Sequence, residues 1–151
     1  MRVEDVMTRG VAFCNPGTNA AAAAEIMWAQ DCGFLPVLED SGRVAGVVTD
    51  RDLFIALGTQ NRNASELTVG EVMHREPSIC ALDDDVRKAM RAMAEHGIYR
   101  LPVVDESGAI RGVLSMDDVV LQVHPEHDDA FNGDVIRTLK AIIENRAASL
   151  G

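Results

Sequence analysis

The chain has 151 residues, a length that accommodates one ordinary domain or two small ones. With 47% hydrophobic and 25% charged residues it can form a packed core, which argues against intrinsic disorder. The formal net charge of −10 repels phosphate backbones and anionic lipid, which argues against nucleic acids and membrane surfaces as partners.

The first ten residues lack the apolar run of a secretion signal, and no segment approaches the roughly 20 apolar residues of a membrane span. Cys14, Cys32 and Cys80 show neither CxxC spacing nor an even framework, which favours free thiols in a reducing compartment. We therefore predict a soluble, cytoplasmic protein.

The first predicted segment, residues 1–57, contains a short strand, a helix, two strands joined by a tight turn, and a second helix. The tight turn is predicted at Gly42, because glycine accepts the positive φ that such a turn requires. The first helix has one narrow face of small side chains, formed by Ala20, Ala23, Ala24 and Met27. The strands are expected at 11–14, 34–38 and 44–48, and the second helix from about residue 50. The order of elements is β-α-β-β-α.

The polar stretch 58–66 is predicted to be a linker, and the same order of elements returns in residues 67–123. The first helix of this segment has a fuller apolar face, formed by Val86, Ala89, Met90 and Met93. Three aspartates at 83–85 precede that face and suit a helix N-terminus. The strands are expected at 78–80, 100–104 and 110–114, and the second helix from about residue 116.

A shift of 66 residues aligns the second segment with the first without a gap. The aligned pairs are Val6-Met7 with Val72-Met73, Cys14 with Cys80, Leu35-Pro36-Val37 with Leu101-Pro102-Val103, Ser41-Gly42 with Ser107-Gly108, Gly46-Val47 with Gly112-Val113, and Asp52 with Asp118. Matches in one register that include turn glycines, prolines and a carboxylate indicate an internal repeat. One copy alone would leave a sheet face uncovered, so we expect the two copies to pack together.

The residues after 123 lie outside the repeat. We predict a loop at 124–133 and an amphipathic helix at 134–151, with Asp134 as its N-cap. The apolar face of this helix contains Val135, Leu139 and Ile142.

These features resemble the CBS domain, which is named after cystathionine β-synthase. The resemblance rests on the Leu-Pro-Val segments with their following acids and turn glycines, and on a Gly-x-x-Thr/Ser-x-x-Asp motif in each copy. The motifs are Gly46-Val47-Val48-Thr49-Asp50-Arg51-Asp52 and Gly112-Val113-Leu114-Ser115-Met116-Asp117-Asp118. The resemblance covers about residues 1–123. It implies an α+β fold of two β-α-β-β-α repeats related by a pseudo-two-fold axis, a pair known as a Bateman module.

The resemblance also implies a function. Such pairs are non-catalytic regulatory modules that bind AMP, ADP or ATP, or less often NAD or S-adenosylmethionine, in clefts between the repeats. They usually form homodimers and signal to a regulated protein, which this sequence does not identify. A dimerisation scaffold with vestigial clefts is the alternative. Phe34 favours it, because this residue cannot contact a phosphate, whereas the aligned residue of the second copy is Arg100.

The chemistry of Ser115-x-x-Asp118 fits a nucleoside phosphate. A hydroxyl at a helix start can donate to a phosphate lying over free backbone N–H groups, and a carboxylate one turn later can accept from two ribose hydroxyls. The same spacing also describes a capping box, in which the two side chains serve only the helix. A single copy favours the capping box, and two copies in one register favour the ligand site.

The family pattern implies two sites of unequal strength. The main site contains Arg100 for the phosphate and Asp118 for the ribose, and the second site has Asp52 with Arg51 as its available cation. The main site comprises Thr8, Gly10, Val11, Ala12, Cys32, Gly33, Arg100, Val113, Ser115 and Asp118. The second comprises Val47, Thr49, Arg51, Asp52, His74, Pro77, Ser78, Ile98 and Tyr99.

Two other kinds of site are not expected. Ligand-type side chains occur in the segment 124–129, but its proline and adjacent acids indicate an exposed loop rather than a metal cage. The sequence has no Ser-His-Asp order, P-loop or nucleophile elbow, so no catalytic residues are predicted.

Overall fold

The computed structural model describes residues 1–127 and 129–150, the last four of them by their backbone alone. The chain divides into two compact units. Unit 1 comprises Met1–Gly10, Ser78–Glu106 and Arg111–Gly151, and unit 2 comprises Val11–Pro77 and Ser107–Ile110. The units therefore do not follow the repeat boundaries, because the leading segment of each repeat packs with the strands of the other.

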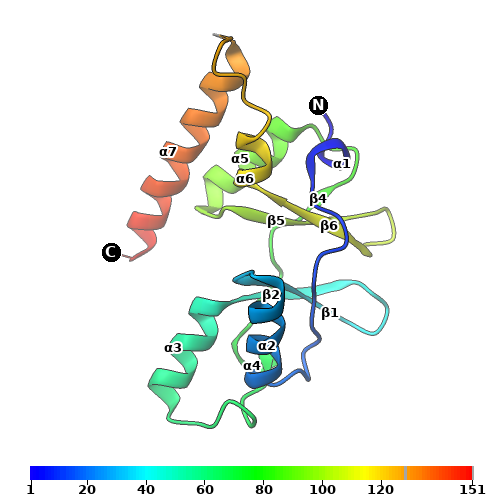
Figure 1. The fold of residues 1–151 in the computed structure, drawn as a ribbon, viewed down its shortest axis with the longest axis vertical. Helices are drawn as coiled ribbons and strands as arrows, with labels where there is room; N and C mark the ends of the chain where they lie inside the picture. Colours follow the sequence, from blue (N-terminus) through cyan, green and yellow to red (C-terminus); the bar gives the residue numbers. More distant parts are fainter. Residues whose placement is uncertain (128, 151) are drawn as a thin grey trace. The chain divides into compact units, whose positions relative to one another are not determined.

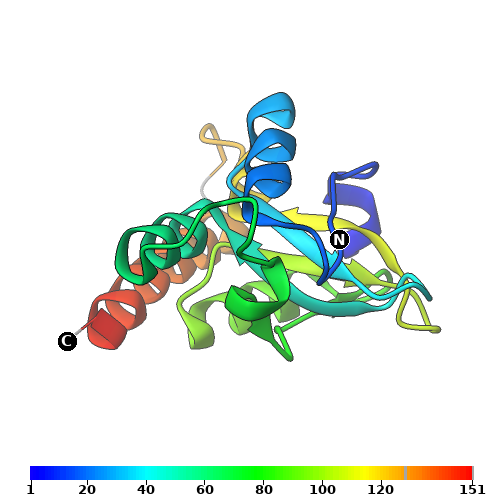
Figure 2. The ribbon, with the colours of Figure 1, turned by 90° about the horizontal axis from the view of Figure 1, so that it is seen from below.

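Unit 2 contains a three-stranded antiparallel sheet in the order β1-β2-β3. Its helices α2, α3 and α4 lie on one side of β1 and β2 (Figure 1) and stand in front of these strands when seen from below (Figure 2). The elements are α2 (Ala20–Gln30), β1 (Phe34–Leu38), β2 (Val44–Thr49), α3 (Asp50–Gln60), α4 (Val69–Val72) and β3 (His74–Arg75). The core of this unit contains Met27, Leu35, Val37, Val48, Leu53 and Leu67, among others.

Unit 1 contains the sheet β4-β5-β6, in which β4 pairs with β5 in parallel. The elements are α1 (Val3–Val6), β4 (Cys80–Ala81), α5 (Val86–His96), β5 (Arg100–Val104), β6 (Ile110–Ser115), α6 (Met116–Val120) and α7 (Ala130–Leu150). Helix α7 packs along α5 (Figure 1). Val135 and Ile142 of α7 are buried in a core with Met90, Met93 and Leu101. The predicted α+β fold, two repeats and a C-terminal helix, is confirmed.

The hairpin turns agree with the prediction from their glycines. Gly42 has a φ of +84° and Gly108 a φ of +82°, values that favour glycine over residues with a side chain. The strands of the two hairpins and the first helix of each repeat begin and end within a few residues of their expected positions. The strand expected at 11–14 is not formed, and an isolated parallel bridge between Cys14 and Val37 stands in its place.

Two boundaries differ from the prediction. Helix α3 continues to Gln60, so the first residues of the predicted linker 58–66 are helical. Helix α7 begins at Ala130 rather than at 134, because the Asn132 N–H donates to Asp129 Oδ1 (2.9 Å) and thereby caps the helix earlier. Asp134 is therefore not the N-cap. Asp128, in the middle of the predicted loop 124–133, lies outside the described residues.

Among the helices of the described chain, none is long and apolar enough to cross a membrane.

Candidate functional site

A capping box holds the carboxylate of Asp118 at the start of α6. Ser115 is the N-cap, and its Oγ accepts from the Asp118 N–H (3.1 Å). In return, Asp118 Oδ2 accepts from the Ser115 N–H and from the Ser115 hydroxyl, both at 2.8 Å. The capping box that the motif predicts is therefore present in the structure. It leaves the second carboxylate oxygen, Oδ1, free of the cap.

Thr8 supplies the partner of that second oxygen. The Thr8 hydroxyl donates to Asp118 Oδ1 (3.0 Å), although 110 positions separate the two residues. Thr8 is held there by an antiparallel bridge to Val113, in which the N–H of each residue donates to the carbonyl of the other at 3.0 Å. Val113 is buried and Thr8 is exposed, so the bridge places the hydroxyl and the carboxylate at the surface end of the sheet.

The motif glycine permits this close approach. A Cβ atom on Gly112 would overlap the Thr8 carbonyl oxygen and would lie 3.1 Å from Met7 Sδ. The aligned Gly46 has the same role, since its Cβ would lie 2.5 Å from the His74 carbonyl oxygen. The first residue of the Gly-x-x-Thr/Ser-x-x-Asp motif is thus a packing requirement rather than a turn residue.

The first repeat contains the equivalent arrangement in unit 2. Thr49 caps α3, Asp52 Oδ2 accepts from the Thr49 N–H (2.9 Å), and Asp52 Oδ1 lies 2.9 Å from His74 Nε2. His74 pairs with Val47 as Thr8 pairs with Val113. Each proposed sugar-binding carboxylate is therefore occupied by a donor from its own unit, a hydroxyl in one case and an imidazole in the other.

The helix starts offer fewer free amides than expected. In α6, the Met116 N–H donates to the Tyr99 carbonyl oxygen (2.9 Å) and the Asp118 N–H donates to Ser115. In α3, the first three N–H groups donate to Gly33 O, Asp50 Oδ1 and Thr49 Oγ1. The expectation of a phosphate lying over free backbone N–H groups is therefore corrected, because side chains and neighbouring carbonyls already use most of them.

Arg100 is the cation that the family pattern assigns to the Asp118 site. It follows Tyr99, whose carbonyl is bonded to the first amide of α6, so it lies next to the start of that helix. Arg100 is exposed, and within the described part of the chain no ion pair engages its guanidinium. The aligned residue of the first repeat, Phe34, carries no charge.

Asp50 is a site residue that the sequence reasoning missed. It is the first residue of α3, and its Oδ1 accepts from the Arg51 N–H (2.8 Å). Its counterpart in the second repeat is Met116, which is buried. At the first helical position the first repeat thus has a carboxylate, which repels a phosphate, where the second repeat has an apolar side chain; the additional acid of the second repeat, Asp117, comes one position later. Comparing the aligned positions 50 and 116 would have revealed this difference.

The other predicted site residues divide between the units. Unit 1 holds Gly10, Ser78, Ile98 and Tyr99 in addition to the Asp118 group, and unit 2 holds Val11, Ala12, Cys32, Gly33, Arg51 and Pro77 in addition to the Asp52 group. Ile98 and Tyr99 pack against the core of unit 1, and the Arg146 guanidinium lies 5.8 Å from the centre of the Tyr99 ring. Ala12 and Cys32 pack against the core of unit 2. That these residues surround common ligands stays a prediction.

Two thiols are unsuited to nucleophilic chemistry. Burial raises the pKa of Cys14 to about 11. Burial, reinforced by the nearby Asp84 carboxylate, raises the pKa of Cys80 to about 12. Both are protonated at neutral pH, and the protonated thiol is a poor nucleophile and metal ligand. Among the residues that the structure describes, no group of three or more His, Cys, Asp or Glu side chains is placed to hold a metal ion.

Comparison with known proteins identifies the family. The sequence model of the CBS domain matches twice, over residues 3–59 and 69–124. The chain belongs to the CBS domain family. The two matches coincide with the internal repeat, so the chain contains a tandem CBS pair.

Relatives with CBS sequence similarity include proteins of different lengths. The chain is 33% identical over 119 residues to the CBS domain-containing protein YhcV of Bacillus subtilis, covering 79% of this chain and 83% of YhcV. It is 31% identical over 123 residues to an uncharacterized protein of Methanopyrus kandleri and spans 62% of that protein's length. It is 29% identical to a homoserine O-acetyltransferase of Methanohalophilus mahii but spans only 24% of that enzyme.

Solved CBS structures share the fold. The crystal structure of CBSX2 in complex with AMP is 30% identical with a TM-score of 0.69, covering 80% of this chain and 93% of CBSX2. The crystal structure of hypoxic response protein I with two coordinated zinc ions is 26% identical with a TM-score of 0.75, covering 82% of this chain and all of that chain.

Proposed function

We propose that this CBS pair is a regulatory module that binds an adenine nucleotide, AMP, ADP or ATP, with Asp118 and Arg100 as its principal polar contacts. The observation that carries the proposal is the carboxylate of Asp118, which Ser115 and Thr8 orient at the start of α6, together with the exposed Arg100 at the start of the strand β5. The binding of AMP by CBSX2 supports the ligand class.

The ribose contact follows from the hydrogen bonds of Asp118. Oδ2 already accepts two bonds from Ser115, whereas Oδ1 accepts one from Thr8. A carboxylate has about four acceptor sites, so Oδ1 can accept from a ribose hydroxyl and, after release of Thr8, from its neighbour. Nucleotide binding therefore competes with the bond that fixes Thr8. The segment Met1–Gly10 is the part of unit 1 whose attachment the ligand would change, and it is a candidate route to a regulated partner.

Arg100 sets the preference among adenosine ligands. A guanidinium binds phosphate through charge-assisted, often bidentate hydrogen bonds. We therefore place the phosphate of the nucleotide at Arg100, outside the occupied helix start. S-Adenosylmethionine has no phosphate and leaves this contact unused, and NAD has a second nucleoside to accommodate. We expect both to bind more weakly than AMP.

Isothermal titration and thermal denaturation test this proposal. With AMP at about 100 times its Kd, the free energy of unfolding should rise by about 2.7 kcal/mol, which corresponds to several degrees in Tm. Adenosine should bind about tenfold more weakly, because it lacks the phosphate that Arg100 contacts. Absence of any response to AMP, ADP, ATP, NAD and S-adenosylmethionine at millimolar concentration would contradict the proposal.

The first repeat should gain nucleotide binding when it receives the residues of the second. We expect the double variant Phe34→Arg with Asp50→Met to bind one additional AMP per chain, since it supplies the missing cation and removes the repelling carboxylate. Titration stoichiometry measures the gain. The variant Phe34→Leu is the control and should bind as the unmodified chain does. An unchanged stoichiometry in the double variant would contradict the role assigned to these two positions.

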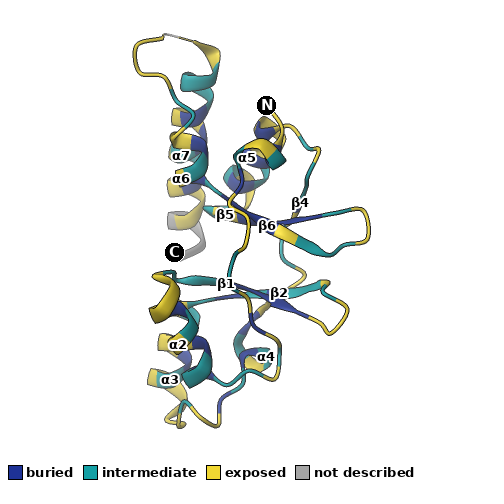
Figure 3. Ribbon diagram, turned by 45° about the vertical axis from the view of Figure 1, so that its right-hand side comes forward, coloured by how far each residue is buried: buried dark blue, intermediate teal, exposed yellow. Residues whose placement is uncertain are grey.

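A dimerisation scaffold is the second candidate, and exposed aromatic side chains favour it. Trp28 on α2 is 89% exposed and Phe54 on α3 is 78% exposed, and the outer sides of both helices are largely exposed (Figure 3). Large exposed apolar side chains of this kind are typical of interfaces. We include a homodimer in the proposal, with this face as its contact surface. Under the scaffold alternative the nucleotide titrations above give no response, and Asp118 and Arg100 can be replaced without effect on assembly.

A further inference from the structure

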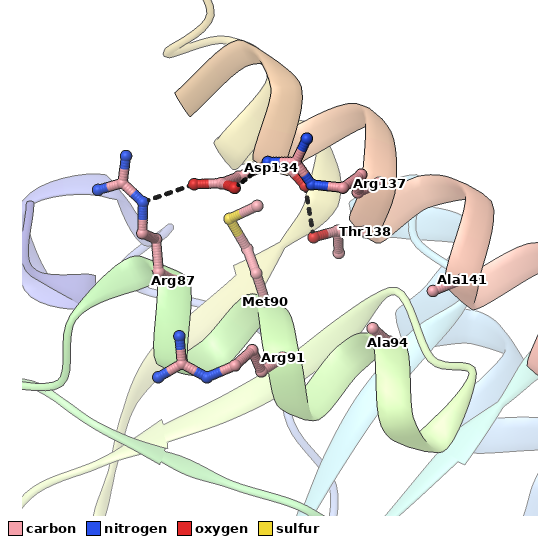
Figure 4. A pocket seen from close by; sticks show the side chains of 8 residues that line it. All are labelled: Arg87, Met90, Arg91, Ala94, Asp134, Arg137, Thr138 and Ala141. Carbon is pink, nitrogen blue, oxygen red and sulfur yellow. Dashed lines mark hydrogen bonds and ion pairs between the residues drawn. The ribbon is translucent and has the colours of Figure 1, made fainter. Parts of the chain in front are cut away.

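A groove between α5 and α7 lies apart from the residues assigned to the nucleotide. It has a volume of about 440 Å³, and all of its lining residues belong to unit 1. Figure 4 shows that its walls are the facing sides of the two helices. Neither Arg100, Ser115 nor Asp118 lines it. A volume of this size lies within the range of small-molecule sites.

Positive charge predominates in this groove. Three of its lining residues are cations, Arg87 and Arg91 from α5 and Arg137 from α7, and one is acidic, Asp134; Asp85 and Asp129 are also close enough to act on the charge of Arg87. The chain as a whole carries 24 acidic and 14 basic residues, so an excess of cations at one place runs against its overall charge. Such a local excess attracts small anions.

Asp134 orients two of the three guanidinium groups. Its Oδ2 accepts from Arg87 Nε (2.7 Å) and its Oδ1 accepts from Arg137 Nη2 (2.5 Å), as drawn in Figure 4. The hydrogen bond from Arg87, and to a smaller extent the one from Arg137, lowers the pKa of Asp134 and keeps it ionised. The Arg87 guanidinium also lies 5.5 Å from the centre of the Phe131 ring. Arg87 is thus fixed on one side, and its terminal Nη groups remain for another acceptor.

Arg91 contributes a cation that pairs with none of the described residues. It lies one helical turn beyond Arg87 on α5, on the groove side of the helix. Among the described residues, none forms a hydrogen bond or an ion pair with its side chain. Met90, Ala94 and Ala141 complete the wall with apolar surface. The groove therefore combines three guanidinium groups with an apolar wall.

We infer that this groove is a second effector site, which binds a small phosphate compound through Arg87, Arg91 and Arg137. Arginine is suited to phosphate because its planar donors engage two oxygens at once, and a polyphosphate or an organic diphosphate has enough oxygens for all three. The apolar wall can accept the organic part of such a ligand. Because the arginines come from both helices, the bound anion would bridge α5 and α7 and fix the C-terminal helix on its unit.

Inorganic pyrophosphate is the probe, titrated against thermal stability and by calorimetry at constant ionic strength. We expect pyrophosphate to raise Tm, and Arg91→Gln to weaken its apparent affinity about tenfold, because the removal of this guanidinium breaks no ion pair among the described residues and takes one cation from the anion. Lys140→Gln is the matched control, an exposed cation on α7 outside the groove, and should bind as the unmodified chain does. Arg91→Gln should leave the response to AMP unchanged.

The remaining arms separate this site from the nucleotide site and from other anions. Arg100→Gln should retain the pyrophosphate response, whatever the outcome of the AMP titrations. Citrate at the same ionic strength should give a much smaller response. The inference is overturned if pyrophosphate has no effect, if Lys140→Gln weakens binding as much as Arg91→Gln, if Arg100→Gln abolishes the response, or if citrate binds equally well.

Discussion

Replacement of Asp118 by alanine is expected to lower the affinity for AMP about a hundredfold, whereas the same replacement of Asp52 should leave it unchanged. Asp118 is the acceptor that we assign to the ribose, and among the described residues the Thr8 hydroxyl is the hydrogen-bond partner of its Oδ1. Two charge-assisted hydrogen bonds to a carboxylate contribute about 3 kcal/mol together, which corresponds to about a hundredfold in Kd. Isothermal titration with AMP measures the difference.

Asp52→Ala is a close control because the two aspartates have the same structural role. Each is the third residue of its helix, and each closes a capping box with Thr49 or Ser115. Both variants should therefore lose about 1 kcal/mol of stability from the cap. If Asp52→Ala lost AMP binding as fully as Asp118→Ala, the assignment of the nucleotide to the second repeat would be wrong. Normal binding by Asp118→Ala would reject the ribose contact itself.

Local patterns were sufficient for the elements of the two repeats. Apolar spacing predicted α2 and α5, and turn glycines predicted the two hairpins, because these features depend on neighbouring residues in the chain. The internal repeat then predicted a second helix directly after the hairpin in each copy. The beginning of α7 was predicted too late, because Asn132 and Gly133 weaken the helical pattern and the cap by Asp129 compensates for them.

Pairing between residues far apart in the chain could not be predicted from these local patterns. The segment Met1–Gly10 joins unit 1 through a bridge from Thr8 to Val113, and this pairing depends on tertiary packing rather than on local propensity. The family resemblance named Thr8, Arg100 and Asp118 as members of one site. It gave no sign that Thr8 occupies the Asp118 carboxylate or that the helix-start amides are already bonded, since both depend on the positions of individual side chains.

The motif glycines connect the fold to the site, which makes Gly112→Ala the most informative stability variant. A methyl group at this position would overlap the Thr8 carbonyl oxygen, so the paired hydrogen bonds between Thr8 and Val113 must lengthen or break. We expect a loss of about 2–3 kcal/mol in the free energy of unfolding, as for other overpacked sites. Because displacement of this segment also moves Thr8 away from Asp118, the response to AMP should change in the same variant.

Gly58→Ala is the matched control, and its expected effect has the opposite sign. Gly58 lies within α3, and a Cβ atom there would meet no atom within 4 Å. Alanine should therefore stabilise the protein by about 0.5 kcal/mol through its helix propensity. Urea denaturation, read at unchanged m-value, compares the two variants. Equal stability of Gly112→Ala and Gly58→Ala would show that the Thr8 segment can move without cost, and the close approach at Gly112 would then not be what holds the site together.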